Sequence, residues 1–220
     1  MGLALMLVLT ACAGASSAEG ERLWQALAEK AKQFAGFAPA HVESHAEVFS
    51  GDGEVRGTVT EVWTLRGWKK GEPDYEVQRQ ETGKPDINIK FRVTAQGTPF
   101  FAASQGQLRF QRVIPEALAD RCFFRFEFAA TQEDKAKGKT MNLEGVAWVD
   151  AKSGAPWKVL YRVPNPEKPI KKWELTLVFP SDPQAPPLPE QVTLHMEGQM
   201  LLWKRSVVLT QRLKEWTAAD

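Results

Sequence analysis

The chain has 220 residues, with 28 lysines and arginines against 27 aspartates and glutamates, so its formal charge is only +1. A balance this even provides no sequence-wide field that would favour nucleic acid or an anionic membrane surface, and we expect no nucleic-acid partner. The length fits a single domain with a sizeable core, for which eight tryptophans and twelve phenylalanines supply wide apolar rings.

The first residues of the chain have the pattern of a targeting segment. Residues 2–9 are apolar, but so short a stretch cannot cross a hydrocarbon core of roughly 30 Å, which takes about 20 helical residues. The stretch is therefore expected to be the apolar part of a signal peptide. It is closed by Leu9-Thr10-Ala11-Cys12, which resembles a bacterial lipobox, a motif whose cysteine is acylated and begins the mature protein.

This resemblance divides the chain into three parts: a signal peptide over 1–11, the lipidated Cys12 with its tether over 12–18, and one domain over 19–220. It implies a cell-envelope protein held to a membrane by a lipid on Cys12. Ala13 after the cysteine favours the outer membrane, facing the periplasm. The opening Lys or Arg of a signal peptide is missing, so we expect a translation start upstream. The alternative is that residues 2–12 form a buried apolar segment.

The second cysteine, Cys122, follows Arg121 and precedes two phenylalanines. If Cys12 is acylated, Cys122 has no intramolecular disulfide partner. We therefore expect Cys122 to be a small core residue.

A helix is predicted over 19–37, where apolar residues recur at spacings of three and four: Leu23, Leu27, Ala31 and Phe34. Gly36 and Pro39 are expected to end it. From Val42 onward the period changes to two, and Gly51-Asp52-Gly53 predicts a hairpin turn.

The alternating pattern then recurs to the end of the chain. A strand is predicted over 87–95, a hairpin over 100–111, and a short helical insertion over 115–120. In the next strand, 122–129, three phenylalanines share one face: Phe124, Phe126 and Phe128. We predict a mainly β, α+β fold, in which one N-terminal helix precedes a curved antiparallel sheet of about ten or eleven strands.

The stretch from Leu143 to Val159 carries a glycine, an aspartate, a second glycine and a proline at characteristic spacing: Gly145, Asp150, Gly154 and Pro156. This arrangement, with the later Leu188-Pro189, resembles the LolA-like superfamily, which includes outer-membrane lipoprotein carriers. The resemblance implies a half-barrel whose concave face holds acyl chains. The same residues also have a purely structural interpretation, because Asp150 and Gly154 form turns and Gly145 leaves room for a bulge or bend.

The candidate apolar ligand surface consists of large side chains in alternating strands: Trp63, Phe91, Phe126, Trp148, Trp173, Met196 and Trp203. A half-barrel needs such side chains either to line a cavity or to fill the interior. Their periodicity does not distinguish these two outcomes.

No catalytic constellation is evident. His41 and His45 are close in sequence, but on a strand four residues span about 13 Å, too far for one metal ion. His195 stands alone, and Ser104 is interpreted as a turn serine. Three basic pairs, Lys69-Lys70, Lys171-Lys172 and Lys204-Arg205, are interpreted as edge lysines that oppose aggregation, with a basic rim for anionic headgroups as the alternative. We therefore expect no enzyme activity, no metal and no cofactor.

The expected function is non-catalytic binding of a hydrophobic ligand, either a lipid or the acyl chain of a lipoprotein, by an anchored envelope protein. The alternative is an anchored structural or interaction module with a filled core and no ligand.

Overall fold

The computed structural model describes residues 12, 15–85, 94–118, 120–134, 139–200 and 203–219, with the backbone alone at 132–134, 139–141, 200 and 203. In chain order the described elements are α2 (Ser17–Lys32), β1 (Phe37–Ser50), β2 (Val55–Lys69), β3 (Glu72–Gly83), a 3-10 helix (Ala95–Gly97), α3 (Pro99–Ser104), β4 (Leu108–Leu118), β5 (Arg121–Asp134), β6 (Lys139–Asp150), β7 (Pro156–Arg162), β8 (Ile170–Val178), β9 (Gln191–Met200) and β10 (Trp203–Ala218). The predicted signal peptide over 1–11 and the residues 86–93 of one predicted strand lie outside the described residues.

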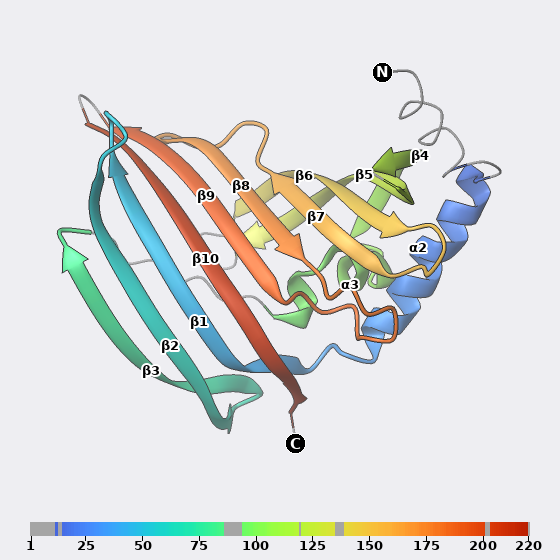
Figure 1. Ribbon diagram of the computed structural model, residues 1–220, viewed down its shortest axis with the longest axis horizontal. Helices are drawn as coiled ribbons and strands as arrows, with labels where there is room; N and C mark the ends of the chain where they lie inside the picture. Colours follow the sequence, from blue (N-terminus) through green and yellow to red (C-terminus); the bar gives the residue numbers. More distant parts are fainter. Residues whose placement is uncertain are drawn as a thin grey trace.

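The strands form one open antiparallel sheet in the order β3-β2-β1-β10-β9-β8-β7-β6-β5-β4. Most neighbours in the sheet are also neighbours in the chain, but β10 returns to pair with β1 along almost its whole length. This pairing joins the start and the end of the domain at the middle of the sheet. Figure 1 shows the resulting curved sheet, with α2 and α3 beside the half that contains β4 to β7. The predicted mainly β fold, with one helix before a curved antiparallel sheet, is confirmed.

Helix α2 begins at a side-chain cap, because the Ser16 hydroxyl accepts a hydrogen bond from the backbone N–H of Glu19 at 3.3 Å. Its buried side faces the sheet and includes Trp24, Leu27 and Ala31. The helix ends at Lys32, earlier than the predicted Phe37, because Phe37 already pairs with Ala218 at the start of β1. Among the described residues, no helix combines the length and the apolar character needed to span a bilayer.

The prediction of a hairpin over 100–111 is wrong. Residues 99–104 form the helix α3, whose Thr98 hydroxyl caps the N–H of Phe101 at 3.4 Å and whose Pro99 occupies the first turn. A capping threonine followed by proline is a typical helix start, since the proline N–H would have no partner there in any case.

The predicted helical insertion over 115–120 is also wrong, because β4 continues as a strand to Leu118. Pro115 lies within that strand and pairs with Phe124. Proline is tolerated there because β4 is an edge strand of the sheet. An edge strand has no neighbouring strand on its open side, so a missing N–H costs no ladder hydrogen bond on that side.

The face of the sheet that carries α2 and α3, called here the helix face, can be followed through the register. One row runs Val113, Phe126, Ala147, Val159, Leu177, Val192, Gln211, Ser44, Glu61 and Arg79 from β4 to β3. The row is apolar from β4 to β9 and polar from β10 to β3. The apolar half is the one that the helices cover.

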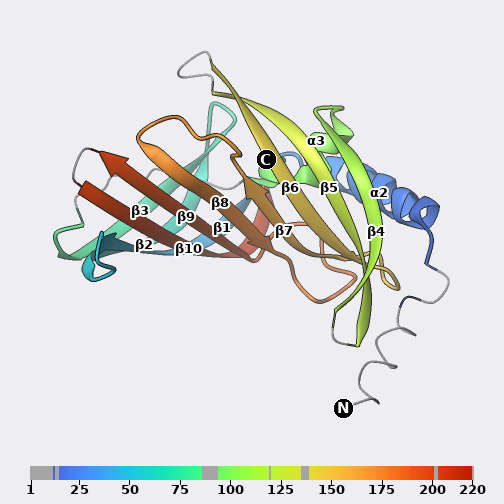
Figure 2. The ribbon, with the colours of Figure 1, turned by 90° about the horizontal axis from the view of Figure 1, so that it is seen from above.

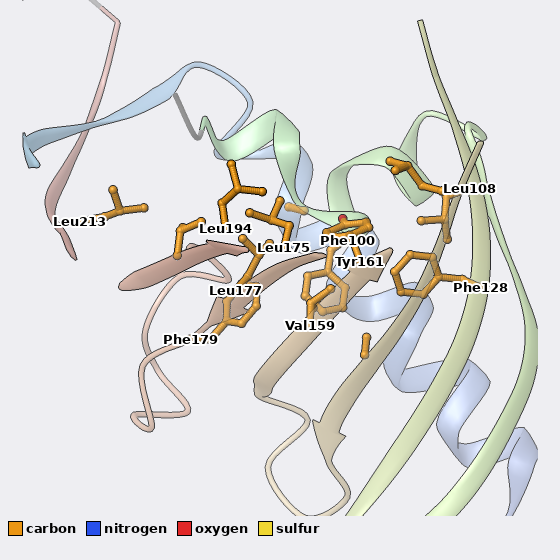
Figure 3. Close-up of a cluster of buried hydrophobic side chains, with 14 of the residues drawn as sticks. Phe100, Leu108, Phe128, Val159, Tyr161, Leu175, Leu177, Phe179, Leu194 and Leu213 are labelled. Atoms are coloured by element: carbon orange, nitrogen blue, oxygen red, sulfur yellow. The ribbon is translucent and has the colours of Figure 1, made fainter. Parts of the chain in front are cut away.

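The phenylalanine-rich part of the core lies between that apolar half and the helices, and buried residues such as Val42, Val59 and Leu209 extend the core over β1, β2 and β10. Phe100 from α3 and Phe124, Phe126 and Phe128 from β5 are at most 2% exposed. Figure 3 shows side chains of β7 to β9, among them Tyr161, Leu175 and Leu194, directed toward α3. The prediction that the three β5 phenylalanines share one face is confirmed.

Candidate functional site

A cleft of about 390 Å³ lies at the β4 edge of the sheet, between α2, α3 and β4. Its lining residues are Trp24, Gln25, Ala28, Glu29, Ala103, Ser104, Leu108, Arg109 and Phe110. Volumes of this size fall within the range of small-molecule pockets, roughly 300–1,000 Å³. Figure 2 shows the three elements that form it at one end of the molecule.

The deep wall of the cleft belongs to an aromatic cluster centred on Trp24, which is only 3% exposed. The Trp24 ring centroid lies 4.8 Å from that of Phe126, 5.2 Å from Phe100 and 6.1 Å from Phe110. Tilted and edge-on ring pairs at these separations are favourable beyond simple area burial. The wall is therefore rigid and apolar.

The rim of the cleft is polar. Gln25 and Glu29 are exposed there. Glu29 is paired with Lys32 at 2.7 Å. Arg109 lies on β4 between Leu108 and Phe110, which face the helices, so its side chain points to the other face of the sheet. A cleft with an apolar wall and a polar rim can bind a chain-like apolar group that ends in a polar head.

The polar half of the helix face contains a second, much smaller hollow of about 10 Å³ beside Trp63. There the Trp63 indole N–H donates to Glu61 at 2.9 Å, and Arg79 donates to the same carboxylate at 2.8 Å. The hydrogen bonds to Glu81 and Glu61 raise the pKa of Arg79, against the opposing effect of burial. The hollow itself is lined mostly by apolar residues, among them Pro39, Val42 and Leu213, and has room for about one water molecule at most.

Four of the seven predicted ligand-surface residues share the helix face: Trp63, Phe126, Trp173 and Met196. None of the four lines the cleft. Phe91 lies outside the described residues. Trp203 occupies the first position of β10, opposite Met200 in register, and its side chain is outside the described part.

Trp148 does not belong to this surface. Its neighbours Ala147 and Val149 point to the helix face, so Trp148 points to the opposite face. There its indole N–H donates to Glu116 at 2.7 Å, and its ring centroid lies 6.4 Å from that of Trp157.

The sequence interpretation missed the cleft residues Trp24, Leu108, Arg109 and Phe110. A signal for Trp24 was available, because Trp24, Leu27, Ala28 and Ala31 recur at the helical spacing of buried residues. For Leu108, Arg109 and Phe110 no local signal exists, since their role follows from how β4 lies against two helices.

The histidines lie on strands, as expected, and point away from the helices. His45 is within 3.2 Å of the Thr60 hydroxyl, and the His195 Nε2 is 3.3 Å from a Glu197 oxygen. Ser104 is the last residue of α3 and donates to the Phe101 carbonyl at 2.7 Å, so its interpretation as a turn serine is corrected. Within the described ranges no cluster of histidine, cysteine, aspartate or glutamate has the arrangement of a metal site.

One lysine in each of two basic pairs forms an ion pair with a neighbouring carboxylate. Lys69 lies 2.6 Å from Asp74, and Lys172 lies 2.9 Å from Glu174. Lys171 donates to the side chain of Gln199. The interpretation as edge lysines is wrong, because β2, β8 and β10, which carry or end at the three pairs, lie inside the sheet, whose edge strands are β3 and β4. The basic rim stays a prediction.

Cys12, the predicted lipid-attachment residue, forms a disulfide with Cys122, and their Cα atoms are 5.1 Å apart. The expectation that Cys122 has no intramolecular partner therefore does not hold in this structure. The segment before α2 passes the start of β5, which brings together residues 110 positions apart in sequence. Lipid attachment at Cys12 stays a prediction.

The signature residues of 143–159 form the β6–β7 hairpin. Gly154 has a φ of +69°, which suits glycine in a turn. The Asp150 carboxylate accepts hydrogen bonds from the Ser153 backbone and from Arg121, both at 2.8 Å. The bulge attributed to Gly145 is instead at Trp148 and Val149.

Comparisons of the chain with protein-family models, with curated proteins and with solved structures gave no match.

Proposed function

We propose that this chain is a cell-envelope lipoprotein, anchored through Cys12 at the outer membrane and facing the periplasm, that binds a hydrophobic ligand without catalysis. The ligand is a lipid or the acyl chain of a lipoprotein. The observation that carries the proposal is the cleft of about 390 Å³ between α2, α3 and β4. Its wall is aromatic, and its rim carries the exposed side chains of Gln25 and Glu29.

The sequence supports the proposed location at the membrane, and the structure supports the proposed binding of a ligand in the cleft. The run Leu9-Thr10-Ala11-Cys12 resembles a lipobox, and the sheet has the open, curved form that the LolA-like resemblance implies. An acyl chain in the cleft would replace water against Trp24, Leu108 and Phe110, gaining about 25 cal/mol for each Å² of apolar surface buried.

The test is uptake of a fluorescent fatty-acid probe by the delipidated protein. Ala103→Trp places a large ring at the cleft, and we expect it to weaken probe binding by about tenfold or more, equivalent to about 1.4 kcal/mol. Ala26→Trp is the matched control, because Ala26 is exposed on α2 and does not line the cleft. Equal binding by both variants and the unmodified protein, or no uptake by any folded form, would refute the proposal.

A second function is favoured by a different observation. The interior beneath the helices is filled, since Phe100, Phe124 and Phe126 are 0% exposed. A filled core suits an anchored structural or interaction module that binds no ligand. Failure of probe uptake by protein that remains folded would favour this alternative.

A further inference from the structure

Two different covalent bonds are assigned to the sulfur of Cys12. The structure bonds it to Cys122, while the lipobox-like run that ends at Cys12 predicts a lipid on the same atom. A thioether or disulfide sulfur has only one partner besides its own Cβ, so the two bonds cannot coexist. We propose that Cys12 has two alternative covalent partners, Cys122 and a lipid, so that unanchored molecules carry the disulfide and anchored molecules carry a free thiol on Cys122.

The strand pairing around Cys122 holds this residue in a fixed position. It is the second residue of β5, and its carbonyl accepts a hydrogen bond from the N–H of Ala151 at 2.9 Å. Strand β5 is paired on both sides, by β4 and β6. The cysteine is thus held on a fixed framework, yet it stays half-buried rather than fully enclosed.

Cys12 lies shortly before α2 in the chain. Its carbonyl accepts from the N–H of Ala15 at 3.1 Å, and Ser16 caps the helix. The disulfide therefore fixes the N-terminal end of α2 against the start of β5. A lipid on Cys12 would instead attach that end of α2 to the membrane.

The chemistry of the disulfide arm balances as thiol–disulfide exchange. The thiolate of one cysteine attacks a disulfide of a dithiol oxidant, and the second cysteine then displaces the oxidant from the mixed disulfide. The two protein thiols lose two electrons and two protons, and the oxidant becomes a dithiol. In the lipid arm the Cys12 thiolate attacks a carbon of an activated lipid donor, so that a C–S bond forms, the donor's bond to its leaving group breaks and the thiol proton passes to a base. No electrons are lost in this substitution, and Cys122, without a partner thiol, stays reduced.

Part of this inference rests on the proposed function, because the lipid arm requires an anchored protein. The experiment compares two preparations under non-reducing, denaturing conditions with a thiol-alkylating reagent and intact mass spectrometry. One preparation is the protein extracted from its native membrane. The other is the chain from Cys12 onward, secreted behind a cleavable leader that adds no lipid.

We expect the membrane-extracted protein to carry lipid on Cys12 and to accept one alkyl group, on Cys122, before any reduction. The lipid-free protein should accept none until it is reduced, and then two. Cys122→Ser should keep its lipid, whereas Cys12→Ser should lose the lipid and expose Cys122 in both preparations.

Two free thiols in the oxidised lipid-free protein would overturn the proposal, and so would a lipid-bearing protein whose Cys122 resists alkylation. Absence of lipid from the membrane-extracted protein would overturn it together with the proposed anchor. Probe uptake by the lipid-free protein is measured separately, so the ligand-binding part of the proposed function stands or fails on its own result.

Discussion

The ring of Phe128 lies over Gly145, its register partner on the neighbouring strand, in the space that a side chain at 145 would need. A Cβ placed on Gly145 would come within 2.1 Å of the Phe128 Cζ. Phe128 is 2% exposed and its ring centroid is 5.5 Å from that of Tyr161, so the ring has little freedom to withdraw. Gly145 thus leaves space in the core for the Phe128 ring, and the hairpin turn depends instead on Asp150 and Gly154.

Gly145→Ala should therefore destabilise the protein. Overpacking of a filled core costs about 1–3 kcal/mol in the free energy of unfolding, which urea denaturation would measure. Gly36→Ala is the control, since no atom lies within 4 Å of the Cβ it would add. Adding Phe128→Leu to Gly145→Ala should recover part of the loss. A similar loss in the Gly36 and Gly145 variants would contradict this account.

Gly145 also illustrates which features of the fold could be predicted from the sequence. Period-two alternation located most strands, and the turn residues Asp150 and Gly154 located their connections. Alternation gives two faces for each strand but does not say which face meets the helix. On β6 the small residues Gly145 and Ala147 face the core because β5 supplies phenylalanines there, and the largest ring, Trp148, faces away.

Trp148→Phe tests that assignment. The variant loses the hydrogen bond to Glu116, and we expect a loss of about 1 kcal/mol in unfolding free energy. Fatty-acid probe uptake should not change, because Trp148 is on the face opposite the cleft. Reduced uptake by a variant that is still fully folded would place Trp148 in the ligand site and contradict the assignment.

The Asp150 carboxylate in the β6–β7 hairpin makes the stability of the protein depend on pH. Burial acts to raise its pKa, but the hydrogen bonds from Ser153 and from Arg121 outweigh burial and hold the pKa below its ordinary value. A depressed folded-state pKa contributes stability above the unfolded value of about 3.9, and that contribution is lost as pH falls through the folded value. We expect the unfolding free energy to decrease below about pH 4.

Asp150→Asn should lower stability at pH 7 and flatten this acid dependence, as measured by denaturation at a series of pH values. Asp182→Asn is the control, because Asp182 is exposed in the loop before β9. An unchanged acid slope in the Asp150 variant would show that other carboxylates control it.

The cleft was less predictable than the fold because its residues come from three separate elements. Trp24 could have been found from helical periodicity. Arg109 and Ala103 could not have been found in this way, because α3 was predicted as a hairpin and its packing against β4 is a tertiary contact. The disulfide was missed for a similar reason, since Cys12 and Cys122 are 110 residues apart and Cys12 was assigned to a lipid.

Trp24 is the residue on which the cleft and the core both depend. Trp24→Ala removes a ring that contacts Phe100, Phe110 and Phe126, so we expect a loss of about 3–5 kcal/mol in unfolding free energy. Trp24→Phe keeps an aromatic wall and should lose less while still taking up the fatty-acid probe. Trp68→Ala is the comparison, because Trp68 is a half-buried tryptophan at the β2–β3 end of the sheet. If Trp24→Ala were no more destabilising than Trp68→Ala, helix α2 would not be held to the sheet through Trp24, and the cleft wall would need another explanation.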